Sequence, residues 1–242
     1  ILNILTGKTP TVGVFLLKQQ MRFDIITIFP ESLRGYFNSS ILGRAQKDKK
    51  IEINLHNLRD FAQDKHKKVD DKSYGGGPGM VLKIEPIVKA IGSILNPKSK
   101  IQNPKVKIVL LSPSGKKFTQ KMAQNWAKKY NNLILICGRY EGVDVRVKKV
   151  LKAEEISIGQ YILTGGELPA AVVVDAVARQ IPNVLGKQES LEEKRGMSGF
   201  PVYTKPEIFE YRGKKYKVPK ILLSGHHIKI KNWRENLSDV II

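Results

Sequence analysis

The sequence predicts an α/β protein that is built on a mainly parallel sheet. Three runs, at residues 106–111, 132–137 and 156–158, are mostly apolar, as is typical of parallel strands that are buried on both faces. Each run leads into a segment that contains glycine and then into a helical pattern. Ligands of open α/β sheets bind at the carboxyl ends of the strands, so we expect the three glycine-containing segments to form one ligand crevice.

These segments are SPSG at 112–115, GRYEG at 138–142 and a longer stretch that contains Gly159, Gly165 and Gly166. Glycine allows main-chain N–H and C=O groups to approach a ligand closely. The pattern therefore favours a small polar ligand that is held largely by backbone groups. From glycine content alone, an ordinary strand–turn–helix is an equal alternative.

The helix that follows the third segment is rich in Ala and Val and is expected to be buried. Its charged pair is Asp175 and Arg179, which are four residues apart and can therefore pair on one face. A salt-bridged core helix is the simplest interpretation of this pattern.

The composition favours a partner that carries many negative charges. Forty-two Lys and Arg against 22 Asp and Glu give a formal net charge of +20, which attracts polyanions and nucleic acid first. A solvated lysine-rich surface is the alternative. The 242 residues, 41% of them hydrophobic, suit one large domain or two smaller ones. The single cysteine, Cys137, excludes an internal disulfide and indicates a core position and a cytoplasmic location.

Residues 1–20 are interpreted as a non-native or upstream extension, because the first methionine, Met21, directly precedes a strand-like run at 22–29. Glycine, lysine and proline break this segment too often for a membrane span, and it lacks the basic region of a signal peptide. A GKT triplet at 7–9 does not complete a P-loop, since Leu2 stands where the first glycine is required.

The next elements continue the alternation of strands and helices. We expect a helix from Glu31 to about Lys47, a partly exposed strand at 51–58, and helices at 84–95 and 118–130. The polar segment 59–80 separates the strand at 51–58 from the helix at 84–95. It is long, has no periodicity and ends in GGGPGM, so we interpret it as a functional loop.

The pattern changes beyond the buried helix. Residues 183–205 are expected to be a flexible linker, and 206–242 a small, partly helical domain with a helix around Trp233. Aromatic residues and cations alternate at 211–217, which suits stacking on RNA bases and neutralisation of phosphates. An exposed hairpin is the alternative. Adjacent histidines at 226–227 point apart in a regular element, so a metal site there is not expected.

Several motifs in the same order resemble those of the bacterial tRNA (guanine-N1)-methyltransferases of the knotted SPOUT superfamily. The resemblance runs from Met21 to about Trp233. Its motifs are IFPE at 28–31, GRA at 43–45, RDF at 59–61, VDDKSYGGGPGM at 69–80, LSPSG at 111–115, CGRYEGVD at 137–144, SIGQYILTGGELPA at 157–170 and LLSGHH at 222–227.

The resemblance implies a trefoil-knotted methyltransferase domain at 21–182 and a shortened tRNA-binding domain at 206–242. Such an enzyme methylates the guanine immediately 3′ of the tRNA anticodon and uses S-adenosylmethionine and a divalent ion, usually Mg²⁺. The family is a homodimer with the active site at the subunit interface. By matching motif, the cofactor contacts fall on Leu111, Ser112, Pro113, Gly138, Tyr140, Glu141, Ser157, Ile158, Gly159, Tyr161, Leu163, Gly165, Gly166 and Pro169. Glu141 would pair with the cofactor's ammonium group.

The reaction also requires a base that removes the proton from guanine N1 and a cation that stabilises charge on O6. Arg179 matches the family's arginine for the second task. The family's aspartate for the first task falls on Lys194 here, and we therefore assign the base to Glu193, with Glu192 as the second choice.

Two other functions compete with this assignment. One is a knotted RNA-binding protein that retains cofactor and tRNA binding but is catalytically impaired, which the lysine at the base position would explain. The other is an NTPase, which rests only on the incomplete P-loop and on a GGGPG loop without the Lys and Ser/Thr that hold phosphate and magnesium.

Overall fold

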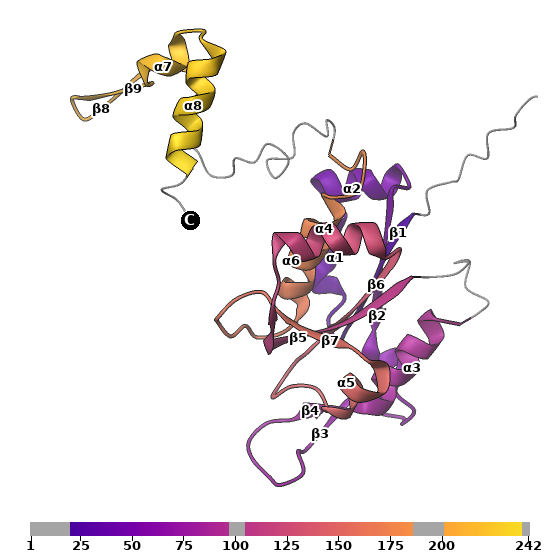
Figure 1. The fold of residues 1–242 in the computed structure, drawn as a ribbon. Coiled ribbons are helices and arrows are strands. Elements are labelled where there is room, and N and C mark those ends of the chain that lie inside the picture. The colour runs from indigo at the N-terminus through magenta and orange to yellow at the C-terminus, as the bar shows by residue number, and fades with distance from the viewer. Residues whose placement is uncertain (1–19, 97–104, 186–200, 239–242) are drawn as a thin grey trace, which may run out of the picture. The chain divides into compact units, whose positions relative to one another are not determined.

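The computed structural model describes residues 20–96, 105–185 and 201–238 (Figure 1). The chain divides between Val184 and Leu185 into two compact units, each of which is described by itself. None of the helices in the described ranges is long and apolar enough to cross a bilayer.

The first unit is organised around a five-stranded sheet in which every pair of neighbouring strands is parallel. In spatial order its strands are β2 (Ile51–Asn57), β1 (Met21–Thr27), β6 (Asn132–Cys137), β5 (Val106–Lys117) and β7 (Glu154–Ser157). All six residues of β6, the central strand, are buried. The predicted α/β class and the mainly parallel sheet are confirmed.

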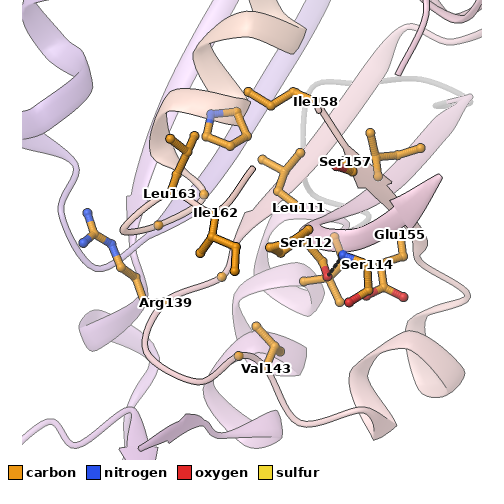
Figure 2. Close-up of a pocket in the computed structure, with 18 of the residues that line it drawn as sticks. Leu111, Ser112, Ser114, Arg139, Val143, Glu155, Ser157, Ile158, Ile162 and Leu163 are labelled. Atoms are coloured by element: carbon orange, nitrogen blue, oxygen red, sulfur yellow. Dashed lines mark hydrogen bonds between the residues drawn. The ribbon is translucent and has the colours of Figure 1, made fainter. Parts of the chain in front are cut away.

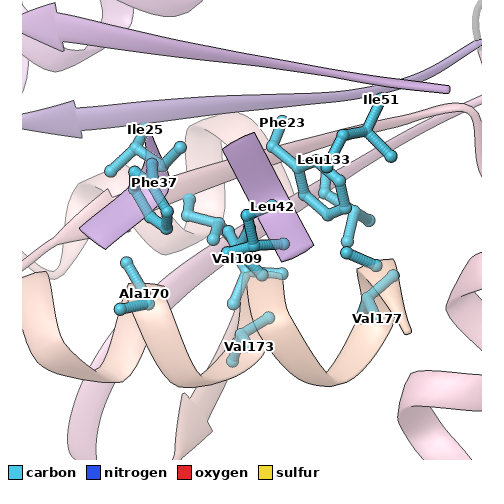
Figure 3. Packing of buried hydrophobic residues seen from close by; sticks show 14 of the residues in the cluster. Phe23, Ile25, Phe37, Leu42, Ile51, Val109, Leu133, Ala170, Val173 and Val177 are labelled. Atoms are coloured by element: carbon cyan, nitrogen blue, oxygen red, sulfur yellow. The ribbon is translucent and has the colours of Figure 1, made fainter. Parts of the chain in front are cut away.

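Helices cover both faces of this sheet (Figure 1). One face packs against α1 (Glu31–Phe37), α2 (Ser40–Lys47), α4 (Gln120–Lys129) and α6 (Glu167–Ala178), and the other against α3 (Ile84–Ile94) and α5 (Arg146–Leu151). Figure 3 shows the first of these cores, where Phe23 and Val109 of the sheet lie near Val173 and Val177 of α6. Seven of the twelve residues of α6 are buried, so the helix packs against the sheet as predicted, although Leu168 and Val172 on its outer side remain exposed.

The prediction of one continuous helix at 31–47 is wrong. The structure has two helices that are interrupted at Asn38 and Ser39, and α2 begins with Ser40 in the left-handed region at φ +49°. Ser39 is extended, as an N-cap residue usually is, so the chain changes direction between the helices.

The SPSG segment was predicted as a loop after a strand, but it lies within β5. Both Leu111 and Lys116 pair with Ile156 of β7, so the four residues between them form a bulge along the strand. Gly115 has to be glycine here, because a Cβ atom would overlap the backbone of Ile156.

The long polar segment is not without structure. It begins with a 3₁₀ helix, η1 (Leu58–Phe61), and contains β3 (Asp70–Asp71), which pairs with β4 (Val81–Leu82). Four of its glycines, at 75–77 and 79, have positive φ. The segment is therefore a structured excursion that returns to the sheet.

The second unit consists of a hairpin, β8 (Ile208–Tyr211) and β9 (Lys214–Lys217), followed by α7 (Lys220–Leu223) and α8 (His227–Ser238). The expected helix around Trp233 is confirmed. The predicted extension at 1–20 and the predicted linker at 183–205 fall largely outside the described residues.

Candidate functional site

A cavity of about 530 Å³ lies where β5, β6 and β7 lead into their glycine-containing segments. Its size is in the range of pockets that bind cofactors. All fourteen predicted cofactor contacts line it: Leu111, Ser112, Pro113, Gly138, Tyr140, Glu141, Ser157, Ile158, Gly159, Tyr161, Leu163, Gly165, Gly166 and Pro169. The three segments thus converge on one crevice, as the sequence predicts.

The cavity has an apolar middle and polar ends. Figure 2 shows Leu111, Ile158 and Ile162 between a polar group, Ser112, Ser114 and Glu155, and Arg139 at the opposite side. Apolar side chains at this position suit the faces of a flat ring, while the polar ends suit charged or hydroxyl groups of the same ligand.

Glu155 is a second carboxylate in the cavity besides Glu141. Lys148 donates a hydrogen bond of 2.9 Å to Oε2 of Glu155. This bond, followed by a hydrogen bond from Ser112, holds the pKa of Glu155 below its usual value despite partial burial. The cavity therefore contains a carboxylate that is ionised at neutral pH.

The loop after β6 holds Glu141 beside the GGGPGM segment. The backbone N–H of Glu141 donates to the carbonyl oxygen of Met80 at 3.0 Å, and the side chain of Glu141 lies against Gly79. Tyr140 has φ +58°, a left-handed conformation that is uncommon for residues other than glycine. The predicted functional loop thus ends against the cavity, next to the carboxylate assigned to the ammonium group.

A buried group of hydrogen bonds connects β1 to two walls of the cavity. Thr27 donates to Oε1 of Glu167 at 2.6 Å, and Arg139 binds Oε2 of the same carboxylate through Nε and Nη2, both at 3.0 Å. Arg139 also donates to the carbonyl oxygen of Thr164 at 3.1 Å. The guanidinium group lies 4.7 Å from the centroid of the Phe29 ring, a cation–π contact. The loop after β6 and the loop before α6 are thus held by one carboxylate.

Two glycines allow these loops to meet. A Cβ atom on Gly166 would lie 2.6 Å from Cα of Cys137 and 2.8 Å from the backbone nitrogen of Gly138. The backbone N–H of Gly166 donates to the carbonyl oxygen of Gly138 at 2.8 Å. Cys137 itself is buried as predicted, and burial raises the pKa of its thiol well above the usual value.

Neither predicted catalytic residue is among the described residues that line this cavity. Arg179 is the C-cap residue of α6 and is not among the described residues that line it, and Glu193 lies outside the described residues. Asp175, the predicted helical partner of Arg179, accepts a hydrogen bond from the hydroxyl of Tyr36 in α1. This bond, with burial, raises the pKa of Tyr36 to about 12.

Sequence reasoning missed several residues of the site. Arg139, Val143, Glu155, Ile162 and Thr164 also line the cavity. Arg139 lies within the GRYEG motif and could have been found as the charged residue between two predicted contacts. Thr27 could not, because its contact with Glu167 depends on β1 lying next to β6.

The residues present fit S-adenosylmethionine. The Glu141 carboxylate can pair with its ammonium group, apolar side chains can contact its adenine ring, and backbone groups in the glycine-containing loops can hydrogen-bond to its polar edges.

The chain is similar to known proteins over most of its length. A family model described as tRNA (Guanine-1)-methyltransferase TrmD matches residues 21–240. A tRNA (guanine-N(1)-)-methyltransferase of Dictyoglomus turgidum is 54% identical over 217 residues, which cover 88% of this chain and 83% of the relative. A protein of the same name from Desulforamulus reducens is 50% identical over 221 residues, 90% of this chain and 84% of the relative.

Proposed function

This chain belongs to the tRNA (guanine-1)-methyltransferase family, and we propose that its 530 Å³ cavity holds S-adenosylmethionine. The chain is an enzyme that methylates N1 of guanine in tRNA, with S-adenosylmethionine as the methyl donor. The finer proposal is that the target is the guanine immediately 3′ of the anticodon. The convergence of all fourteen predicted contacts on one cavity is the observation that carries the assignment of the cofactor site.

S-adenosylmethionine supplies an electrophilic methyl group when it is bound. The chain's own residues must then do two things: remove the proton that guanine N1 carries at neutral pH, and stabilise the negative charge that develops on O6. We assign the charge stabilisation to Arg179 and the proton removal to Glu193.

The position of Arg179 supports an active site that is built from two chains. Gly166, at the start of α6, lines the cavity, whereas Arg179 follows the end of the helix. The helix has twelve residues and is therefore about 18 Å long. Because this length exceeds the reach of an arginine side chain, a second copy of the chain would have to bring its Arg179 to the cavity.

Apolar residues on the outside of α6 also support a homodimer. Leu168 and Val172 are 64% and 47% exposed and lie four residues apart on one face of the helix, and Ile162, beside the cavity, is 86% exposed. Contiguous apolar residues of this kind mark interaction sites. Light scattering should give twice the mass of the chain. Val172→Glu places a charge on this apolar face, so the variant should be monomeric and should no longer methylate tRNA.

The second unit is proposed to bind tRNA, because the basic composition of the chain attracts nucleic acid. A cytoplasmic location is proposed as well. Removal of residues 206–242 should weaken tRNA binding and leave cofactor binding unchanged.

A requirement for Mg²⁺ is proposed from the family alone. The described residues contain no group of three His, Cys, Asp or Glu side chains that could hold a metal ion, so no protein ligands can be named among them. Mg²⁺ often binds through one or two carboxylates together with substrate phosphates. A chelator should abolish methylation, and added Mg²⁺ should restore it.

The function is tested by transfer of a labelled methyl group from S-adenosylmethionine to tRNA transcripts that differ only in the base after the anticodon. Transfer should occur only when this base is guanine, and the product should be N1-methylguanine. Transfer to a guanine elsewhere would contradict the proposed position. Binding of cofactor and tRNA without transfer would favour the catalytically impaired RNA-binding protein.

A further inference from the structure

The β8–β9 hairpin has two chemically different faces. Its register pairs Phe209 directly with Tyr216. Residues that are directly opposite in a hairpin, and residues two apart on a strand, point to the same face. Phe209, Tyr211, Tyr216 and Lys214 therefore share one face, whereas Lys215 and Lys217 lie on the other with Ile208 and Glu210. We call these the aromatic face and the basic face.

Two rings of the aromatic face are nearly parallel, and all three are exposed. The planes of Phe209 and Tyr211 are within 9° of parallel, and their centroids are 6.4 Å apart. Phe209, Tyr211 and Tyr216 are 55%, 53% and 55% exposed. A half-exposed π surface of this size can stack on another flat group.

The turn adds a cation to this face. Arg212 and Gly213 form the two-residue connection and both have positive φ, 49° and 70°, as tight hairpin turns require. The guanidinium carbon of Arg212 lies 5.3 Å from the centroid of the Tyr211 ring. A group that stacks on Tyr211 therefore meets a positive charge at the tip of the hairpin.

The charge around the hairpin identifies the partner. Residues 205–220 contain six Lys and Arg against two Glu. An apolar protein surface would remove these cations from water without pairing them, which is unfavourable. Double-stranded RNA would supply phosphates, but its base faces are already stacked on one another. An unpaired RNA segment offers phosphates and free base faces together.

We propose that the hairpin binds an unpaired segment of the tRNA substrate, with bases stacked on the aromatic face and phosphates paired with Arg212 and with the basic face. This rests on the proposed function, in which the second unit binds tRNA, and it divides that binding between two faces. The aromatic face selects unpaired nucleotides, and the lysines add affinity for any RNA.

The aromatic face is tested with the full chain and three probes: a tRNA transcript, a single-stranded oligoribonucleotide of about twelve nucleotides, and a duplex of the same length. Tyr211→Leu should weaken binding of the single strand and of tRNA about tenfold, as expected for one lost stacking contact. Tyr211→Phe keeps the ring and should bind as the parent does. Ile208→Val, an apolar change on the basic face, is the matched control and should also have no effect.

The basic face should respond differently. The double variant Lys215→Gln, Lys217→Gln should weaken binding of single strand and duplex alike, and should lower the dependence of affinity on salt by about 0.7 in the logarithmic slope per lysine for the single strand. Tyr211→Leu should leave this slope unchanged. Retained duplex binding in Tyr211→Leu also shows that the hairpin is still folded.

In the binding experiments, two results would overturn the proposal. One is a double variant Phe209→Leu, Tyr211→Leu that binds the single strand as tightly as the parent. The other is a change in particle mass in that variant with no loss of RNA affinity, which would assign the aromatic face to contacts between proteins. A parent chain that transfers no methyl group would contradict the proposed function itself. Methylation with an unchanged KM for tRNA in the double variant would contradict only the role of the hairpin.

Discussion

Thr27 and Glu167 are 140 residues apart in sequence, yet the Thr27 hydroxyl donates a hydrogen bond of 2.6 Å to Oε1 of Glu167. Both side chains are buried, and the same hydroxyl accepts a hydrogen bond from the backbone N–H of Phe29 at 2.9 Å. Glu167 binds Arg139 with its other oxygen, so the end of β1 determines where two walls of the cavity lie. A buried hydrogen bond to a charged group contributes about 1.5–3 kcal/mol to stability.

The first prediction is that Thr27→Val weakens cofactor binding from a distance. Valine has a similar shape but leaves Oε1 of Glu167 and the N–H of Phe29 without this partner. The free energy of unfolding should fall by about 2 kcal/mol, and calorimetry should show the affinity for S-adenosylmethionine reduced about fivefold, since Arg139 is less well held. Thr119→Val removes an N-cap from α4, where Thr119 accepts from the N–H of Met122 at 3.3 Å. This control should lose about 1 kcal/mol of stability with no change in cofactor affinity. Equal affinities in the two variants would contradict the positioning role.

The second prediction compares two glycines. Gly166→Ala places a Cβ atom against the backbone of Cys137 and Gly138, so the walls of the cavity must separate. Such overpacking costs about 1–3 kcal/mol of stability, and S-adenosylmethionine binding should be strongly reduced. Gly92 in α3 has no atom within 4 Å of the corresponding position. Gly92→Ala should therefore stabilise the protein by about 0.5–1 kcal/mol and leave the cofactor affinity as it is. Parent-like cofactor affinity in Gly166→Ala would show that the cavity does not bind S-adenosylmethionine.

The third prediction concerns stability at acid pH. Asp24 in β1 is buried, and burial alone would raise its pKa, but hydrogen bonds from His56 and Arg22 hold this pKa below its usual value. The distances to Oδ1 of Asp24 are 2.7 Å from Nε2 of His56 and 2.8 Å from Nη2 of Arg22. A carboxylate with a lowered folded-state pKa stabilises the fold above its unfolded-state pKa, and this contribution is lost as the pH falls through the folded-state pKa.

Asp24→Asn should accordingly lower the free energy of unfolding at neutral pH by about 3 kcal/mol or more, because Arg22 loses its buried partner. The difference from the parent should shrink as the pH falls below about 4. Urea unfolding at a series of pH values measures this difference. Asp48→Asn, which removes an exposed partner of Lys50, is the control and should show little change at any pH. A constant difference between Asp24→Asn and the parent across this range would mean that the charge of Asp24 is not responsible.

The strands of the sheet were predictable where burial is uniform. The apolar run at 132–137 coincides with β6, because the central strand of a parallel sheet is covered on both faces. The end of β5 was not predictable, since Pro113 and Gly115 indicate a loop when they are considered locally. Pairing of Lys116 and Lys117 with β7 extends the strand through them, and this pairing is a tertiary effect.

The prediction of the candidate site had two sources. Pattern reasoning gave the three glycine-containing segments and their convergence, but the individual contacts came from the resemblance to a family. The Thr27–Glu167–Arg139 group was missed because it depends on the order of strands in the sheet, which local sequence does not encode. One signal was available. A carboxylate directly after Gly165 and Gly166, at the start of a helix whose only other charged residue is Asp175, is expected to have a specific partner when it is buried.

The fourth prediction concerns the general base, for which the resemblance to the family predicts a departure in this chain. By matching motif we expect Lys194 at the place of the family's aspartate, and Glu193 directly precedes it. An ammonium group beside a cationic sulfonium and Arg179 would be repelled, so Lys194 is a poor base. Glu193 is one residue away, and the additional methylene of glutamate extends its reach. A small change in the course of the backbone can therefore bring its carboxylate to guanine N1.

A positioned base accelerates a reaction about a hundredfold to ten-thousandfold. Single-turnover methylation should therefore fall by this factor in Glu193→Ala, whereas Glu192→Ala serves as the neighbouring control and should retain most of the rate. Lys194→Asp restores the family's residue and should keep or raise the parent rate. If Glu192→Ala, Glu193→Ala and the double variant all methylate at the parent rate, neither carboxylate is the base, and Lys194 or a group of the substrate must remove the proton. If the parent transfers no methyl group while Lys194→Asp does, the lysine has inactivated an enzyme whose binding sites are still present.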